Sequence, residues 1–197
     1  MVQEISVKMW SSSHLCHWHS VPEFIQQGWC TRFARPEIDA QSGRKMSDLV
    51  ENDVTDDMIF KYSSGINQVQ LILLGGNNID DGEEPENLES HVRRILDFAL
   101  SLENVHLVIC GLMPRGRYNQ GSTEKFLQAN KSLFKLCQGY KNTSFLNFFK
   151  IYIKHGIFQE QYFKPDLVHV NSYGAQIMAR SIINHLNTFV KKKTFTD

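Results

Sequence analysis

The sequence predicts one α/β domain in which helices cover both faces of a mainly parallel sheet, giving three layers. The first observation is that short segments rich in β-branched or aromatic residues alternate with longer segments of helical periodicity. The second is that two of the short segments are almost continuously apolar, as is typical of strands covered on both faces. Such alternation favours parallel strands joined by crossover helices. With 197 residues and no repeat or linker, the chain is long enough to bury one substantial core.

Four short apolar segments are predicted to be strands. They are residues 5–10, 69–76, 105–112 and 143–149. Residues 28–66 have a weaker pattern, from which we expect a short strand, a helix around residues 47–52 and loops.

Three segments carry an apolar stripe at the spacing of one helix face. In residues 86–103 the stripe consists of Leu88, Val92, Ile95, Leu96 and Ala99. In residues 122–137 it consists of Phe126, Ala129, Leu133 and Cys137. In the last helix it consists of Ala175, Met178, Ala179, Ile182 and Leu186. We expect residues 1–190 to form the single domain, and the basic tail, residues 191–197, to be frayed.

Charge and composition exclude some classes of protein. Lys plus Arg and Asp plus Glu number 21 each, so no overall field attracts nucleic acid, and we do not expect this chain alone to bind it. No apolar run reaches the length of a bilayer span, and the first residues lack the apolar core of a secretory signal. The four cysteines are widely spaced without a CxxC pair, which indicates reduced thiols in a cytoplasmic protein. The lysine-rich tail is where a membrane or lipid contact would be sought, and the oligomeric state is open.

Polar residues follow the predicted strands where each strand ends. Serines occupy positions 11–13, directly after the strand predicted at residues 5–10. Asn77 and Asn78 follow the glycine pair that ends the segment 69–76, and Asp166 and His169 precede the last helix. The carboxyl ends of parallel strands meet at one edge of a sheet, so these side chains can converge. A serine hydroxyl becomes a nucleophile when an imidazole takes its proton, and a carboxylate orients that imidazole. An amide side chain and backbone N–H groups can hold the developing oxyanion. This inventory indicates acyl transfer.

These segments, in this order, resemble the sequence blocks of the SGNH (GDSL) hydrolase superfamily. The stretch "LLGGNNI" matches the asparagine block, with Gly75 and Asn77 in its positions, and "DLVHVNSYG" matches the final block, with Asp166 and His169. The resemblance covers residues 11–181, nearly the whole chain. It implies an SGNH-type, flavodoxin-like sheet.

The other two blocks match less closely. The glycine block is "QSGRKMSDL", which gives Gly43, with Gly28 as the alternative. The usual Gly-Asp-Ser reads here as Ser11-Ser12-Ser13, which makes Ser13 the expected nucleophile and Ser12 the alternative register.

The resemblance implies a triad of Ser13, Asp166 and His169, and an oxyanion hole formed by Ser13, Gly43 and Asn77. It implies hydrolysis of short acyl esters, acetyl first, with no metal and no other cofactor. Within the superfamily the chain looks most like the esterase domain in the first open-reading-frame protein of LINE-type retrotransposons, and is also similar to acetylhydrolases of the platelet-activating-factor type. In the first case the domain would be a module of a retrotransposon protein.

Structural interpretations compete with these roles. Asp166 could be an N-terminal helix cap, and the serines could cap the helix expected after them. Arg115 and Arg117 beside the predicted active edge favour either an anionic substrate or a solvated loop. A second hypothesis is that the chain has the same fold but no catalytic activity. It would then be a catalytically degenerate SGNH domain that serves as a binding or assembly module, associated with RNA or membrane.

The histidines at 14, 17 and 19 also suggest an alternative, because they could form a zinc cluster. On a helix His14 and His17 lie on nearly one face and His19 does not, so we expect no metal.

Overall fold

The structure is a computed structural model that describes residues 5–12, 36–51, 68–99, 102, 105–116 and 120–193. Within these ranges the predicted fold class is confirmed, because helices cover both faces of a parallel sheet. No helix in the described ranges combines the length and the apolar character that a membrane span requires.

The central sheet has five parallel strands in the order β2-β1-β3-β4-β5. This is the flavodoxin-like order of doubly wound sheets. The strands are β1 Ser6–Ser11, β2 Glu37–Ala40, β3 Gln68–Leu73, β4 Val105–Cys110 and β5 Thr143–Leu146. The short strand expected within residues 28–66 is β2, at the edge of the sheet beside β1.

Side chains of the central strands alternate between two hydrophobic cores. Leu71 of β3 and Val108 of β4 belong to one core, whereas Ile72 and Ile109, their neighbours along the chain, belong to the other. Successive residues of a strand point to opposite faces, and all six residues of β3 and of β4 are buried. The nearly continuous apolar runs of the sequence therefore arise because both faces are covered.

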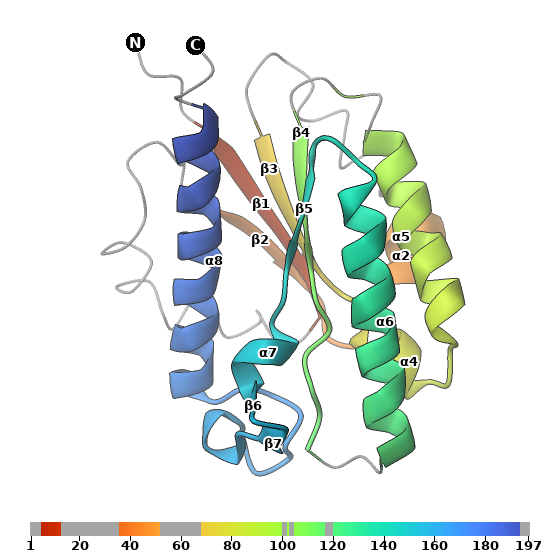
Figure 1. Cartoon of the computed structure of the whole chain (residues 1–197), viewed down its shortest axis with the longest axis vertical. Helices are drawn as coiled ribbons and strands as arrows, with labels where there is room; N and C mark the ends of the chain where they lie inside the picture. The colour runs from red at the N-terminus through yellow and green to blue at the C-terminus, as the bar shows by residue number, and fades with distance from the viewer. Residues whose placement is uncertain are drawn as a thin grey trace.

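The helices form the two outer layers (Figure 1). One face is covered by α8, Ser172–Lys193, which begins beside the carboxyl ends of the strands at the bottom of the view. The other face is covered by α2, α5 and α6, which are Met46–Glu51, Pro85–Ala99 and Gln120–Gln138. The helices expected at 47–52, 86–103, 122–137 and in the last segment are thus all present, with ends shifted by a few residues.

Short elements gather at the carboxyl ends of the strands (Figure 1). They are α4 Gly76–Asp80, α7 Phe149–Tyr152, the antiparallel pair β6 Ile153–Lys154 and β7 Ile157–Phe158, and the 3-10 helix η3 Glu160–Tyr162. His155 and Gly156 join β6 to β7 with φ angles of 52° and 77°. Two residues with positive φ are the signature of a tight hairpin turn whose twist matches its strands.

Two of the four cysteines fall in the described ranges. Cys110 and Cys137 are free and buried, as expected of reduced thiols, and burial raises the pKa of both.

The junction after β4 is fixed by a buried polar side chain that the sequence analysis did not single out. Asn130 of α6 accepts a hydrogen bond from the backbone N–H of Leu112 at 2.7 Å and donates one to the Leu112 carbonyl at 3.1 Å. Both groups are buried, so water cannot replace these bonds. Asn130 therefore holds the start of the loop after β4 against the middle of α6.

Replacing Asn130 by Ala should destabilise the protein by about 1–3 kcal/mol for each backbone group left without a partner. Urea unfolding followed by circular dichroism measures this loss. Lys131→Ala, at an exposed neighbouring position of α6, is the matched control and should change the free energy of unfolding by less than about 0.5 kcal/mol. Equal stabilities for the two variants would show that Asn130 does not hold the loop.

Candidate active site

The pairing register brings the ends of the strands to one edge. Ser11, the last residue of β1, is paired with Ala40 of β2 and with Leu73 of β3, each also the last residue of its strand. In the same way Cys110 is paired with Leu146 at the ends of β4 and β5. The chain segments that carry the predicted site residues therefore start from one edge of the sheet, as expected.

The serine segment is described up to Ser12. Ser11 is fully buried, and its Oγ has no hydrogen-bond partner within the described part of the chain. Ser12 is also buried. Ser13 lies outside the described residues, as does Gly28, the alternative for the glycine block. Ser13 therefore stays the predicted nucleophile.

Gly43 occupies a tight turn after β2. The N–H of Arg44 donates to the Gln41 carbonyl at 3.2 Å, and Gly43 has a φ of +79°. Among the described residues no atom lies within 4 Å of a side chain built at this position. Glycine is favoured here by the backbone conformation, as at the third position of a type II turn, and not by lack of space. Its role as an oxyanion donor stays a prediction.

Asn77 is held at both ends of its side chain. Its Nδ2 donates to the Arg44 carbonyl at 3.0 Å, and its Oδ1 accepts from Nη2 of Arg115 at 3.4 Å. The first bond joins the asparagine block to the glycine block, because Arg44 directly follows Gly43. The second bond fixes which end of the carboxamide is the donor. One Nδ2 hydrogen is used by Arg44, and the amide has a second to offer.

The next residue, Asn78, has a structural role. It is fully buried; its Oδ1 accepts from the N–H of Met46 at 2.8 Å, and its Nδ2 donates to Glu83 at 2.7 Å. The first of these bonds ties the start of α2 to α4. The two neighbouring asparagines therefore differ: Asn78 is buried and bonds the backbone of Met46, whereas Asn77 is only partly buried.

Arg115, in the loop after β4, is buried rather than solvating the loop. Only 4% of its side chain is exposed, and its Nη2 lies 3.0 Å from Oδ2 of Asp80 at the end of α4. Burying a guanidinium is costly unless a carboxylate pairs with it, and Asp80 is that partner. Arg115 also packs where a side chain at Gly76 would lie, with Nη2 2.7 Å from such a Cβ. The solvated-loop interpretation is therefore wrong for Arg115, and Arg117 lies outside the described residues.

Asp166 and His169 form a compact pair. Oδ2 of Asp166 lies 2.9 Å from Nδ1 of His169, and Oδ1 accepts from the backbone N–H groups of Val168 and His169 at 2.8 and 2.9 Å. One carboxylate thus shapes the turn with one oxygen and holds the ring with the other. With Nδ1 engaged, the second ring nitrogen, Nε2, is the one that can exchange a proton with a substrate group.

Electrostatics keep Asp166 ionised. Its partial burial alone would raise the pKa of this carboxyl, but the N–H groups of His169 and Val168, and then the ring of His169, outweigh that effect. The pKa of Asp166 is consequently held well below its ordinary value. The carboxylate is therefore charged at every pH at which an imidazole would need orientation.

The alternative that Asp166 caps the last helix is wrong. The helix α8 begins at Ser172, and its first turn is capped by Asn171, whose Oδ1 accepts from the N–H of Gly174 at 2.9 Å. Nδ2 of Asn171 in turn donates to the carbonyl of Phe163 at 3.1 Å, which ties the helix start to the hairpin-like loop carrying His169. Asp166 is thus left for the histidine.

A chain of contacts connects the pair to Asn77. The N–H of Gly116 donates to the carbonyl of Leu167 at 2.9 Å, between Asp166 and His169 in sequence. Gly116 follows Arg115, which bonds Asn77, and Asn77 bonds Arg44. At the other end, the N–H of Gln41 donates to the carbonyl of Ser11 at 3.0 Å. The described parts of all four sequence blocks are therefore connected around the edge.

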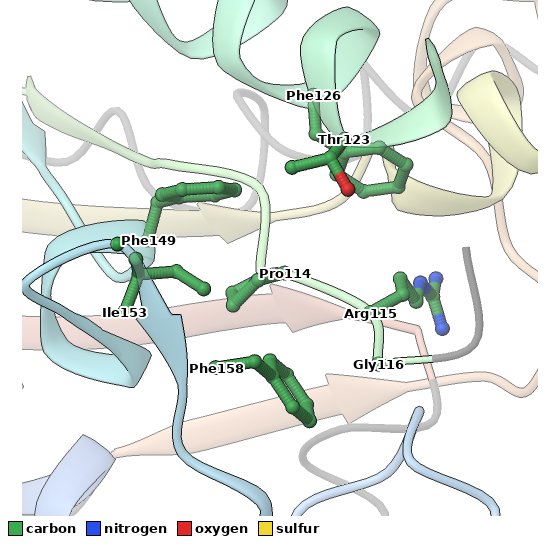
Figure 2. A pocket seen from close by; sticks show the side chains of 9 residues that line it. Pro114, Arg115, Gly116, Thr123, Phe126, Phe149, Ile153 and Phe158 are labelled. Atoms are coloured by element: carbon green, nitrogen blue, oxygen red, sulfur yellow. The ribbon is translucent and has the colours of Figure 1, made fainter. Parts of the chain in front are cut away.

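A cavity of about 170 Å³ lies beside this chain of contacts, between the loop after β4, the start of α6 and the β6–β7 hairpin. Figure 2 shows Phe149 and Ile153 on one side of Pro114 and Arg115 on the other. The cavity is lined by Pro114, Arg115, Gly116, Thr123, Phe126, Phe149, Ile153, Gly156 and Phe158.

Sequence reasoning missed several residues that build the site, namely Arg44, Asp80 and Asn130, and it did not predict the structural role of Asn78. Asn130 could have been found, because it falls on the apolar stripe of its helix, where an amide needs a partner. No group of three His, Cys, Asp or Glu side chains that could hold a metal occurs in the described ranges, and His14, His17 and His19 lie outside them.

Comparison with known proteins places the fold among esterases. No family model matches the chain, and no curated protein matches it in sequence. Solved structures do match: a carbohydrate esterase family 3 protein from Talaromyces cellulolyticus has a TM-score of 0.72 at 16% identity, with 95% of this chain and 99% of that one covered.

Two bacterial structures give the same result. The acetylxylan esterase Axe2 from Geobacillus stearothermophilus has a TM-score of 0.72 at 13% identity, covering 93% of this chain and 94% of that one. The esterase EstA from Pseudoalteromonas has a TM-score of 0.70 at 13% identity, covering 94% and 98%. At these identities the likeness establishes the fold. The narrower resemblance to retrotransposon proteins stays a prediction.

The depressed pKa of Asp166 predicts how this turn responds to acid. The carboxyl ¹³C signal of Asp166 should show no protonation step of its own from pH 8 to about pH 4, where an ordinary aspartate is half protonated, and should show that step only at lower pH. Because the folded pKa lies below the unfolded one, the turn's contribution to stability should be present above about pH 4 and lost as the pH falls further.

The His169→Ala variant is the control for this titration. In this variant the pKa of Asp166 should remain below its ordinary value, because the two backbone N–H bonds to the carboxylate remain. A titration midpoint near 4 in the unmodified protein would contradict the geometry of the turn.

Proposed function

We propose that this protein is a serine esterase of the SGNH type that hydrolyses short-chain acyl esters, with acetyl the favoured acyl group. The observation that carries the proposal is the Asp166–His169 pair, 2.9 Å apart and connected through Gly116 and Arg115 to Asn77 at the same edge of the sheet. The likeness in fold to three esterases supports it.

In the proposed reaction Ser13 attacks the ester carbonyl carbon while Nε2 of His169 takes the hydroxyl proton. Asp166 keeps the ring oriented through Nδ1 and stabilises the imidazolium. The carbonyl oxygen becomes an oxyanion, which accepts hydrogen bonds from the side chain of Asn77 and from the backbone N–H groups of Ser13 and Gly43.

The tetrahedral intermediate then collapses. The bond to the alcohol oxygen breaks, His169 returns its proton to that oxygen, and the acyl group stays on Ser13. A water molecule repeats the sequence with His169 as base, which releases the acid and restores the serine.

Hydrolysis of p-nitrophenyl acetate tests the proposal. Ser13→Ala and His169→Ala should each lower kcat by about four to six orders of magnitude, because serine and histidine act as a unit. Asn77→Ala should lower it about 10²- to 10³-fold with little change in KM, because an oxyanion donor acts in the transition state. Ser12→Ala is the matched control and should retain activity. The proposed mechanism is wrong if the protein has no turnover, or if activity survives in both Ser13→Ala and His169→Ala.

Arg115 should act on the reaction through Asn77. Arg115→Met removes the bond to Oδ1 and leaves the carboxamide held only through Nδ2, so kcat should fall about 10- to 100-fold. In an Asn77→Ala background the same change should lower kcat by a clearly smaller factor, because the part of the loss that acts through the carboxamide is already absent.

Steady-state kinetics of the four proteins in this double-mutant cycle provide the measurement. Arg93→Met removes an exposed arginine of α5 and serves as the control for a general loss of charge. Independent, multiplicative losses from Arg115→Met and Asn77→Ala would mean that the guanidinium does not act through the asparagine.

A second candidate function is favoured by one observation, the replacement of Gly-Asp-Ser by three serines. In that case the domain would be a binding or assembly module without catalysis. A fluorophosphonate probe separates the two, because a working triad is modified at Ser13 and a degenerate site is not.

Peptide mapping is essential in that experiment because another serine contacts histidines. Oγ of Ser144 lies 3.0 Å from Nε2 of His106 and 2.8 Å from Nε2 of His185. Ser144 is near the amino end of β5, away from the predicted active edge. Labelling there would not count as evidence for the esterase.

A further inference from the structure

We propose that the cavity between Pro114, Phe149 and Phe158 is the subsite that receives the alcohol part of the ester, and that this part is an aromatic ring. The inference rests on the proposed function in taking the ligand to be part of an ester, but the binding of such a ring does not require catalysis. Three observations lead to it.

The first is the character of the walls. Phenyl rings come from three elements, α6 with Phe126, α7 with Phe149 and β7 with Phe158, and Pro114 and Ile153 lie between them. Figure 2 shows these side chains arranged around a common space. Such a lining favours an apolar group, and aromatic rings pack favourably edge to face against one another.

The second is size. The cavity is about 170 Å³. An apolar protein cavity of about 150 Å³ is known to hold benzene. A ring of six carbons therefore fits this space, whereas an acetyl group would leave most of it empty. If the acyl group is acetyl, the group that fills the cavity belongs to the alcohol.

The third is location. Gly116 lines the cavity and donates its N–H to the carbonyl of Leu167, the residue between Asp166 and Val168. A Cβ at Gly116 would lie only 2.5 Å from Phe158, in the wall of the cavity, and 2.9 Å from Leu167, in the turn of Asp166 and His169. Glycine thus lets the cavity wall and the turn that carries His169 lie against each other. In the proposed reaction His169 protonates the alcohol oxygen, so a leaving-group subsite belongs beside it.

Binding of 4-fluoroanisole, followed by its ¹⁹F signal, tests the proposal without any need for turnover. This probe has one ring and one acceptor oxygen and cannot be hydrolysed by an esterase. We expect saturable binding to the unmodified protein. Fluorobenzene, which lacks the methoxy group, should also bind saturably, because the walls of the cavity contact the ring itself.

Ile153→Trp fills the cavity and should weaken binding of 4-fluoroanisole by about tenfold or more. Leu127→Trp adds the same side chain at an exposed position of α6 and should leave binding unchanged. If circular dichroism shows that Ile153→Trp does not fold, Thr123→Phe on the opposite wall takes its place.

Absence of saturable binding, or equal binding by the protein with the filled cavity, overturns the subsite. Binding as expected in a protein that does not hydrolyse p-nitrophenyl acetate would refute the esterase and leave the ring-binding site in place.

Discussion

The buried guanidinium of Arg115 is the interaction on which the carboxyl edge of the sheet depends. It has 4% of its side chain exposed and is paired with Asp80 at 3.0 Å, so the loop after β4 must lie against the end of α4. A buried charge without its partner is strongly unfavourable, which makes this placement hard to change. From there Nη2 reaches Oδ1 of Asn77, and the next residue, Gly116, bonds the turn of Asp166 and His169. One charged side chain thus sets the position of two otherwise separate loops.

In the turn at Asp166, one carboxylate determines both the backbone shape and the orientation of a side chain. The same carboxylate accepts two backbone N–H groups and one ring nitrogen, so the shape of the turn and the orientation of His169 cannot be changed independently. Leu167 adopts a φ of +56° within this turn, a conformation that costs a residue with a side chain about 1–2 kcal/mol. Its carbonyl is the acceptor for Gly116, so the strained residue is also the one that joins the turn to the loop after β4. Strain of this kind persists where surrounding contacts determine the conformation, and it concentrates at functional sites.

Much of the fold was predictable because burial on both faces leaves a strong signal in the sequence. Continuous apolar runs marked β3 and β4, and apolar stripes marked α5, α6 and α8. The edge strand β2 was placed only loosely, because an edge strand is half exposed and its pattern is weak. Asp166, His169 and Asn77 were found because their residue types and order suggest a reaction. The roles of Asp80 and Asn78 were not predicted, since each bonds a residue distant in sequence and only the folded chain shows that residue.

The pairing of Arg115 with Asp80 also decides between interpretations of this arginine that the sequence left open. From sequence, an arginine between a proline and a glycine has the composition of a solvated loop. Burial reverses that interpretation, because a guanidinium withdrawn from water must be hydrogen-bonded by the protein, and its bonds then position other groups. The oxygen of Asn77 is such a group here, and the guanidinium also occupies the space beside Gly76.

The central claim is that one hydrogen-bonded edge brings Asn77 and His169 to a common nucleophile. A crystal structure of the protein after reaction with diethyl p-nitrophenyl phosphate tests it most directly, because the phosphoryl oxygen occupies the position of the oxyanion. The account predicts phosphorus bonded to Oγ of Ser13, with the phosphoryl oxygen about 3 Å from Nδ2 of Asn77 and the Asp166–His169 pair beside it. Phosphorus on another serine, or a phosphoryl oxygen turned away from Asn77, would contradict it.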